Sequence, residues 1–162
     1  MKTKKADLRA YGICPGKGRN YENIIYVLAL IYNRLQTQAE RYLSRYQLTA
    51  LQFNLLMLAA YQNEGKGLSQ VEIAKRLIVS ASNITKLVEK SVQEGLLTRK
   101  TNPLSRRENV ICITAKGQKR IDTLWPGYDN LVRGLTEKIP AKHRLHLEQI
   151  LNNWLTDLWE EK

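Results

Sequence analysis

A run of small and polar residues offers hydrogen-bonding groups at the start of a predicted helix. Asn83 carries the paired donor and acceptor that match the edge of an adenine, and hydroxyl groups can bond to bases or to phosphates. An α-helix fits the major groove of DNA, and its first turns touch the base edges. The pattern therefore predicts a base-reading surface made by Ser80, Ala81, Ser82, Asn83, Thr85 and Lys86.

A pair of arginines lies where the sequence predicts the tip of a β-hairpin. Residues 96–100 and 110–113 have the composition of strands, and residues 101–109 between them form a long basic loop in this interpretation. An arginine at the tip of such a hairpin can enter a narrow minor groove, where the negative potential is strong. We therefore expect Arg106, Arg107 or both to reach DNA.

A local role is the alternative for these arginines, because one of them can pin the loop through a salt bridge to Glu108. Other cations in the middle of the chain can contact phosphates whatever the base sequence. A single surface lysine is, however, more often only solvated. The candidates for phosphate contacts are Lys66, Lys75, Arg99 and Lys100.

Two short helices joined by a tight turn must position the base-reading residues. Ser69 is predicted to cap the first helix, with Glu72 completing a capping box, and Ser80 is predicted to cap the second. Capping is thus an alternative role for the Ser80 hydroxyl. Gly95 suits the left-handed residue that commonly follows a helix. Helices of about ten and fifteen residues joined by three or four residues are typical of a helix-turn-helix.

Longer helices are predicted on both sides of this unit. The first begins near Asn20, and the next is capped by Thr49, with Gln52 three residues on as in a capping box. After the hairpin, a helix capped by Thr114 runs to about residue 134, with a break possible at residues 125–127.

The last predicted helix opens at Pro140 and carries a wide apolar stripe. A terminal helix on a monomer of this size cannot easily hide so much apolar surface, so the stripe predicts a dimer interface. Its members are Leu147, Ile150, Leu151, Trp154 and Leu158.

Length and composition limit the class of protein. The 162 residues suit one domain with a substantial core. No apolar run approaches the roughly 18 residues that a membrane span needs, so no membrane-spanning segment is expected. Two cysteines cannot form a disulfide framework, which favours a reducing cytoplasm.

The net charge of +11 points to a polyanionic partner, and its distribution narrows the choice. Residues 64–120 carry twelve Lys and Arg against five Asp and Glu, and residues 1–20 carry six against one. Residues 121–162 are mildly acidic and hold all three tryptophans. The positive charge therefore coincides with the helix pair and hairpin, which favours double-stranded DNA over a membrane surface.

These features resemble the MarR family of winged-helix transcription regulators. The matching motifs lie in order between residues 48 and 117 and are Leu48-Thr49-x-x-Gln52-Phe53, Leu68-Ser69-x-x-Glu72-Ile73, Ser82-Asn83-Ile84-Thr85, Glu94-Gly95-Leu96-Leu97 and Ser105-Arg106-Arg107. The resemblance implies a mainly α fold with a small β-wing, as one domain of 162 residues. In that domain a basic arm (1–19) precedes a winged helix-turn-helix (48–117), and dimerisation helices (20–47 and 118–162) flank it.

The resemblance also implies a homodimer that binds a pseudopalindromic operator, usually as a repressor, and is often released by a small phenolic ligand. Two positions depart from the family pattern, because Ser105 replaces an acidic residue and Ile78 stands where glycine is common. Two other functions stay open. One is a winged-helix module that binds protein, and the other is an architectural DNA binder without sequence preference.

Other reactive residues support weaker hypotheses. Cys14 lies beside Lys17 and Arg19, whose charges can lower the pKa of its thiol and make redox sensing possible. His143 and His146 have a spacing that can hold a metal, but neighbouring cations disfavour it and no third ligand is apparent. No nucleophile–base pair or phosphate-binding glycine loop is present. The sequence therefore predicts no metal, no cofactor and no enzymatic activity.

Overall fold

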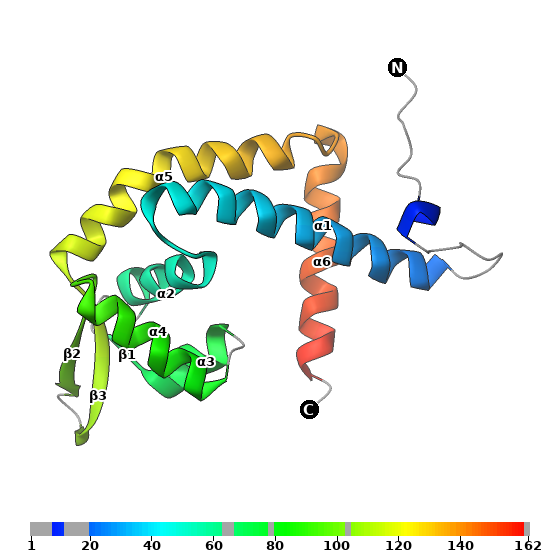
Figure 1. Cartoon of the computed structure of the whole chain (residues 1–162). Coiled ribbons are helices and arrows are strands. Elements are labelled where there is room, and N and C mark those ends of the chain that lie inside the picture. Colours follow the sequence, from blue (N-terminus) through cyan, green and yellow to red (C-terminus); the bar gives the residue numbers. More distant parts are fainter. Residues whose placement is uncertain (1–7, 12–19, 63–66, 78–79, 103–104, 161–162) are drawn as a thin grey trace.

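A computed structural model describes residues 8–11, 20–62, 67–77, 80–102 and 105–160. The fold is mainly helical with a small three-stranded sheet, as predicted (Figure 1). Its elements in chain order are η1 Leu8–Tyr11, α1 Asn20–Leu43, η2 Ser44–Tyr46, α2 Ala50–Tyr61, β1 Leu68–Ser69, α3 Gln70–Leu77, α4 Ala81–Gln93, β2 Leu97–Asn102, β3 Ser105–Ile113, α5 Ala115–Thr136 and α6 Ala141–Glu160.

Local hydrogen bonds begin several of these helices where the sequence predicts them. The Thr49 Oγ1 accepts from the Gln52 backbone N–H at 3.1 Å, and the Thr114 Oγ1 accepts from the Gly117 N–H at 3.0 Å. At the end of α4, Gly95 has a φ of 71°, which confirms the predicted left-handed residue. These interactions span only a few residues, so each depends on the local sequence.

The start of α3 shows the predicted capping box. The Ser69 Oγ accepts from the Glu72 N–H at 3.2 Å, and a carboxylate oxygen of Glu72 accepts from the Ser69 N–H at 2.9 Å. The Ser69 hydroxyl also lies 2.9 Å from that carboxylate oxygen. These hydrogen bonds lower the pKa of the Glu72 carboxyl below its ordinary value of 4.5.

This box supports a stability prediction. Ser69→Ala should lower the free energy of unfolding by about 1 kcal/mol near neutral pH, because two hydrogen bonds are lost. Since the Glu72 pKa is lowered in the folded chain, its stabilisation exists above 4.5 and disappears as the pH falls through the lowered pKa. The difference between Ser69→Ala and the wild type should therefore shrink in acid.

Denaturant unfolding at several pH values measures this difference, with Ser80→Ala as the matched control. The Ser80 hydroxyl makes no hydrogen bond to an N–H group of α4, so its removal should cost much less stability. An equal cost for the two substitutions would contradict the prediction.

The core lies where α2, α3 and α4 meet the sheet and the first half of α5. In the sheet, β3 lies between β1 and β2, and all strands are antiparallel, with Leu68 opposite Ile111 and Leu97 opposite Ile113. Fully buried side chains from each of these elements make one cluster, which includes Leu55, Leu56, Leu68, Ile73, Ile84, Val88, Leu97, Ile111, Ile121 and Leu124. This cluster holds the helix pair and the wing as one unit.

The predicted wing strands were too short, and the predicted long loop was wrong. The strand β2 continues to Asn102 and β3 starts at Ser105, so the backbones of Arg106 and Arg107 belong to β3. Pairing is regular as far as Thr101, and the register then shifts. Backbone hydrogen bonds extend the strands past Lys100 and before Val110, and this pairing needs no apolar side chain. The prediction therefore covered only the parts of the strands that carry the buried residues Leu97, Val110, Ile111 and Cys112.

The possible break in α5 is also absent, because the helix continues through Pro126. The Tyr42 hydroxyl donates to the Leu124 carbonyl at 2.7 Å, which ties α1 to α5 next to the proline. A Cβ atom at Gly127 would overlap the Tyr42 hydroxyl, so the glycine permits this close approach. Figure 1 shows α1 and α5 side by side, with α5 changing direction along its length.

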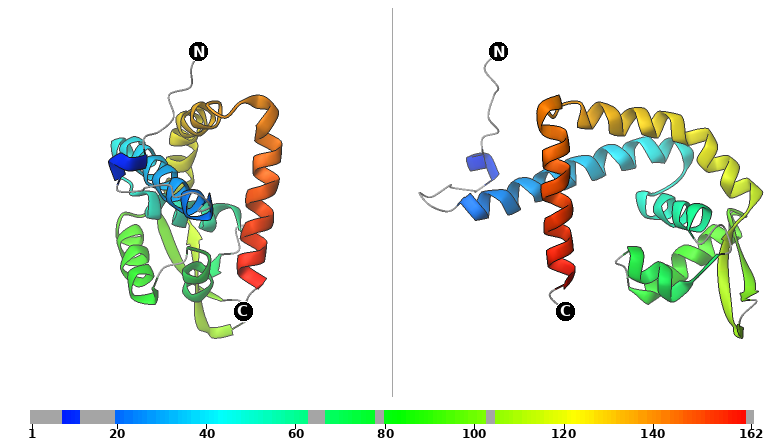
Figure 2. Two further views of the ribbon diagram at one scale, coloured as in Figure 1. Left: turned by 90° about the vertical axis from the view of Figure 1, so that its right-hand side faces the viewer. Right: turned by 180° about the vertical axis from the view of Figure 1, so that it is seen from behind.

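The final helix stands apart from the core. No residue of α6 is buried, and the left view in Figure 2 shows α6 beside the rest of the chain. No helix in the described ranges is long and apolar enough to cross a membrane.

Candidate nucleic-acid interface

The helix α4 has one buried face and one polar face. Ile84, Val88 and Ser91 are fully buried at positions four and three residues apart, which anchors that face to the core. On the other side, Ser82, Asn83 and Lys86 are exposed, and Thr85 is half-buried. Four of the predicted base-reading residues thus share one end of one helix, while the side chain of Ala81 lies outside the described part.

Ser80 occupies the N-cap position of α4 without acting as a side-chain cap, so this part of the prediction was wrong. Its backbone is extended, but its hydroxyl accepts no N–H of the helix. The Ser80 Oγ instead lies 3.3 Å from the Ser82 Oγ, and both residues are exposed. The hydroxyl that capping was expected to occupy is therefore part of the exposed polar end of α4.

The predicted phosphate-contacting cations are exposed where the structure describes them. Lys75 is exposed on α3, and Arg99 and Lys100 are exposed on β2. Lys66 lies outside the described residues, as do the side chains of Arg106 and Arg107. For Arg106 and Arg107 the structure therefore describes only the backbone, which belongs to β3.

An ion pair between the helix and the wing was missed by sequence reasoning. The Arg99 guanidinium lies 3.9 Å from the Glu89 carboxylate, and both side chains are about half exposed. The two residues lie on different elements, α4 and β2, so no local spacing pattern indicates the pair. A hollow of about 620 Å³ lies beside the pair, between α3, α4 and the wing strands.

The predicted dimer surface is exposed. On α6, Ile150 is 48% and Leu158 is 54% exposed, Leu151 is also exposed, and Leu147 and Trp154 are half-buried. Further apolar side chains are exposed on α6 and on α1, namely Leu145, Leu155 and Trp159 of α6 and Tyr21, Ile24 and Ile25 of α1. Such an extent of apolar surface is unusual for a monomer.

A second hollow, of about 300 Å³, lies between α1 and α5. Apolar and aromatic side chains line most of it, including Tyr32, Leu35, Tyr128 and Leu131, and Gln36 adds a polar group. Burial raises the pKa of the Tyr128 hydroxyl. This hollow has the lining that suits a small aromatic molecule.

The remaining candidate residues are two cysteines and two histidines. Cys112 is buried in β3, in keeping with a packing role, and Cys14 lies outside the described part of the chain. His143 and His146 are exposed on α6. Within the described ranges no three His, Cys, Asp or Glu side chains lie close enough together to hold a metal ion.

Comparison with known proteins gives a consistent result. Residues 46–108 match the family model described as MarR family. The chain is 26% identical over 119 residues to the HTH-type transcriptional regulator MhqR of Bacillus subtilis, which covers 71% of this chain and 80% of the relative. It is 26% identical over 107 residues to the HTH-type transcriptional repressor YetL of the same organism, covering 66% and 64%.

Solved structures share the fold. The MepR–DNA complex of S. aureus superposes with a TM-score of 0.71 at 22% identity, covering 82% of this chain and 96% of MepR. CouR from Rhodococcus jostii bound to p-coumaroyl-CoA superposes with a TM-score of 0.72 at 23% identity, covering 81% and 90%.

The fold and the matched segment together define a winged-helix DNA-binding regulator of transcription. Residues 46–108 of this chain, its winged-helix segment, are similar to the MarR family of regulators.

Proposed function

We propose that this chain is a homodimeric repressor that binds a pseudopalindromic operator and leaves it when a small aromatic molecule occupies the hollow between α1 and α5. The exposed polar end of α4, made by Ser80, Ser82, Asn83 and Lys86, is the observation that carries the proposal. These side chains are short or flexible and none is acidic, which suits a base edge better than a protein surface. In the dimer, Ala81 and the wing residues Arg106 and Arg107 would join this contact.

Dimerisation follows from the exposed apolar faces of α1 and α6. A second copy is the occupant that we propose for them, since a two-fold axis lets the same stripe cover itself. Two-fold symmetry would present one α4 helix to each of two half-sites, about 34–36 Å apart along the duplex. That arrangement predicts an inverted repeat in the bound sequence.

The proposed function also includes repression, and release of the protein from DNA by a ligand. One relative, YetL, is named a repressor, and a protein bound over a promoter excludes polymerase without further machinery. The hollow between α1 and α5 offers tyrosine rings for stacking and the Gln36 amide for a polar group, which fits a phenolic compound. CouR with its bound p-coumaroyl-CoA shows that the same fold can hold an aromatic ligand.

Selection of bound sites from a pool of random duplexes tests the proposal. We expect an inverted repeat, and we expect log affinity to fall with log salt at a slope of about −5 or steeper, as six phosphate contacts per dimer would give. Repeating the binding with a panel of phenolic compounds tests the release. Equal affinity for selected and random duplexes would favour an architectural DNA binder instead. A slope near zero would contradict the role of the basic surface.

A further inference from the structure

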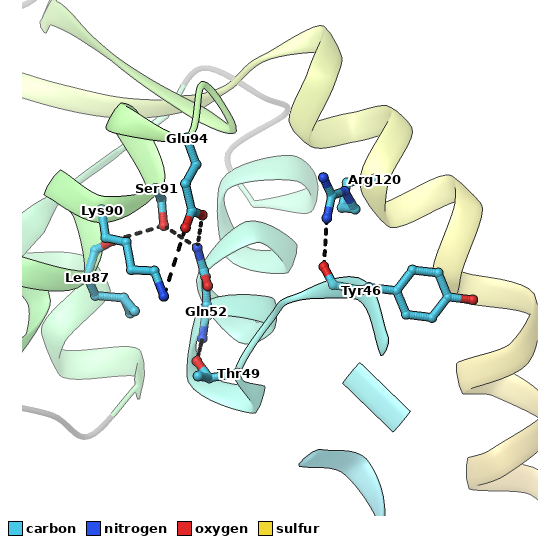
Figure 3. A network of polar contacts seen from close by, with 8 residues as sticks. All are labelled: Tyr46, Thr49, Gln52, Leu87, Lys90, Ser91, Glu94 and Arg120. Atoms are coloured by element: carbon cyan, nitrogen blue, oxygen red, sulfur yellow. Dashed lines mark hydrogen bonds and ion pairs between the residues drawn. The ribbon is translucent and has the colours of Figure 1, made fainter. Parts of the chain in front are cut away.

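A buried amide lies beneath the end of the recognition helix α4. Gln52, in the first turn of α2, is 0% exposed, and its side chain does not complete the capping box that its spacing predicts. Its Nε2 instead donates to the Ser91 Oγ at 3.3 Å and to the Glu94 Oε2 at 2.6 Å (Figure 3). Ser91 is also 0% exposed, and Glu94 directly follows the last residue of α4. The two helices are therefore joined by a polar contact inside the core.

The hydrogen-bond directions require an amide at position 52. The Ser91 hydroxyl donates to the Leu87 carbonyl at 2.8 Å, so its oxygen accepts from Gln52. The Glu94 carboxylate can only accept. Both partners therefore need an N–H donor, and an uncharged amide supplies two from one atom.

The oxygen of the same amide makes this arrangement costly. The Oε1 of Gln52 is buried and has no hydrogen-bond partner among the residues that the structure describes. An unpaired buried acceptor destabilises a fold, and an apolar side chain of similar volume would avoid that loss. Stability alone therefore does not account well for an amide at position 52. Its directional hydrogen bonds to Ser91 and Glu94 account for it better.

Side chains at the start of α5 hold the turn that follows α4. The Lys116 Nζ donates to the Glu94 carbonyl at 2.6 Å, and the Thr114 Oγ1 donates to the Gly95 carbonyl at 2.7 Å. The Lys90 Nζ lies 3.9 Å from the Glu94 carboxylate, and Lys116 and Arg120 line the same hollow as Glu94. The contact from Gln52 adds α2 as a further fixed point for α4.

The apolar contacts of α4 determine how deeply the helix packs into the core, but they determine its rotation about its own axis less well. Ile84 and Val88 are buried, but dispersion contacts have little directionality. Side-chain tips lie about 5–6 Å from a helix axis, so a rotation of about 20° moves them by about 2 Å. A displacement of that size breaks a hydrogen bond to a base edge.

We propose that Gln52 is a positioning residue for DNA recognition. Through Ser91 and Glu94 it sets the rotation of α4, and thereby the direction in which Ser82 and Asn83 meet the bases. This inference rests on the proposed reading of DNA by α4.

A carboxylate at position 52 tests the proposal, with the duplex that the wild-type chain selects from a random pool as the probe. Gln52→Glu puts a second carboxylate against Glu94, and two close carboxylates repel unless they share a proton. We expect affinity to fall about tenfold or more at about pH 8, and to recover by about fivefold at about pH 5.5, relative to the control. The control is Gln93→Glu, which makes the same charge change at an exposed position of α4.

A swapped pair tests the geometry. In the double variant Gln52→Glu/Glu94→Gln, the new amide at position 94 can donate to the new carboxylate at position 52. The Ser91 hydroxyl can also turn toward that carboxylate, since its proton is free to rotate. The double variant should bind the duplex better than Gln52→Glu alone. If the contact between positions 52 and 94 has no effect on binding, the losses of the single variants Gln52→Glu and Glu94→Gln should add instead.

A variant without charge covers the case in which Gln52→Glu does not fold. Gln52→Met removes the amide at similar volume, and we expect a folded protein with about tenfold weaker binding and altered base preference. Amide hydrogen exchange in the last turn of α4 should rise in Gln52→Met and stay unchanged in Gln93→Glu. This second readout needs no DNA, so a chain that selects no duplex refutes the proposed function while the exchange data still judge the positioning role. Unchanged exchange, affinity and base preference in Gln52→Met would overturn the inference.

Discussion

Leu151→Glu should convert the protein to a monomer and weaken operator binding by about 10²-fold to 10⁴-fold, because the two half-sites would no longer be bound by one linked unit. Leu151 lies within the exposed apolar stripe of α6, between Ile150 and Trp154. A carboxylate there must lose its hydration when a second copy covers the stripe, and no cation of the stripe itself compensates it. In the monomer the same carboxylate stays in water.

The matched control for this variant is Gln149→Glu. Gln149 is exposed and lies about 160° around α6 from Leu151, given about 100° per residue, so its new charge should remain in solvent in the dimer. Sedimentation measures the association state, and binding of the selected duplex measures the affinity. A dimeric Leu151→Glu variant with wild-type affinity would show that α6 is not the dimer interface.

Asn83→Ala should cost about 1–3 kcal/mol of binding free energy at each half-site, and about twice that for a dimer on both half-sites. The side chain of Asn83 is exposed in the first turn of α4, so its removal should leave the free energy of unfolding almost unchanged. The paired donor and acceptor of the amide cannot be replaced by water in the same geometry. We therefore expect lower affinity together with relaxed base preference.

The loss of preference distinguishes base contact from phosphate contact. Repeating the selection with Asn83→Ala should relax one position in each half-site, whereas loss of a phosphate contact weakens all duplexes about equally. Asn130→Ala, at an exposed position of α5, is the control for removal of an amide elsewhere. Uniform weakening of all duplexes by Asn83→Ala would assign Asn83 to the DNA backbone.

The sequence predicted the wing only in part. The strands were recognised from their apolar residues, but the pairing of Thr101 with Asn109 joins two exposed residues with no apolar pattern. The Glu89–Arg99 ion pair was missed for a related reason, since charged residues are common on any solvated face. Contacts between exposed residues are difficult to predict from a sequence, because many residue types can make them.

The sequence by itself determined the features that depend on neighbours within one helical turn. The Ser69–Glu72 box, the Thr114 cap and the buried stripe of Ile84 and Val88 follow from local spacing, and with them the helix pair and its polar end. Local hydrogen bonds and helical periodicity form wherever those residues occur in order, so their positions could be predicted.

Only the tertiary structure decided which distant residues meet. Gln52 had the spacing of a capping residue, yet it bonds to Glu94, 42 positions away, because α2 packs against the end of α4. Pro126 had the character of a helix breaker, yet α5 continues where Tyr42 of α1 bonds to the adjacent turn. A contact between elements depends on how their surfaces pack in three dimensions, and that packing has no signature in the spacing of residues along the chain.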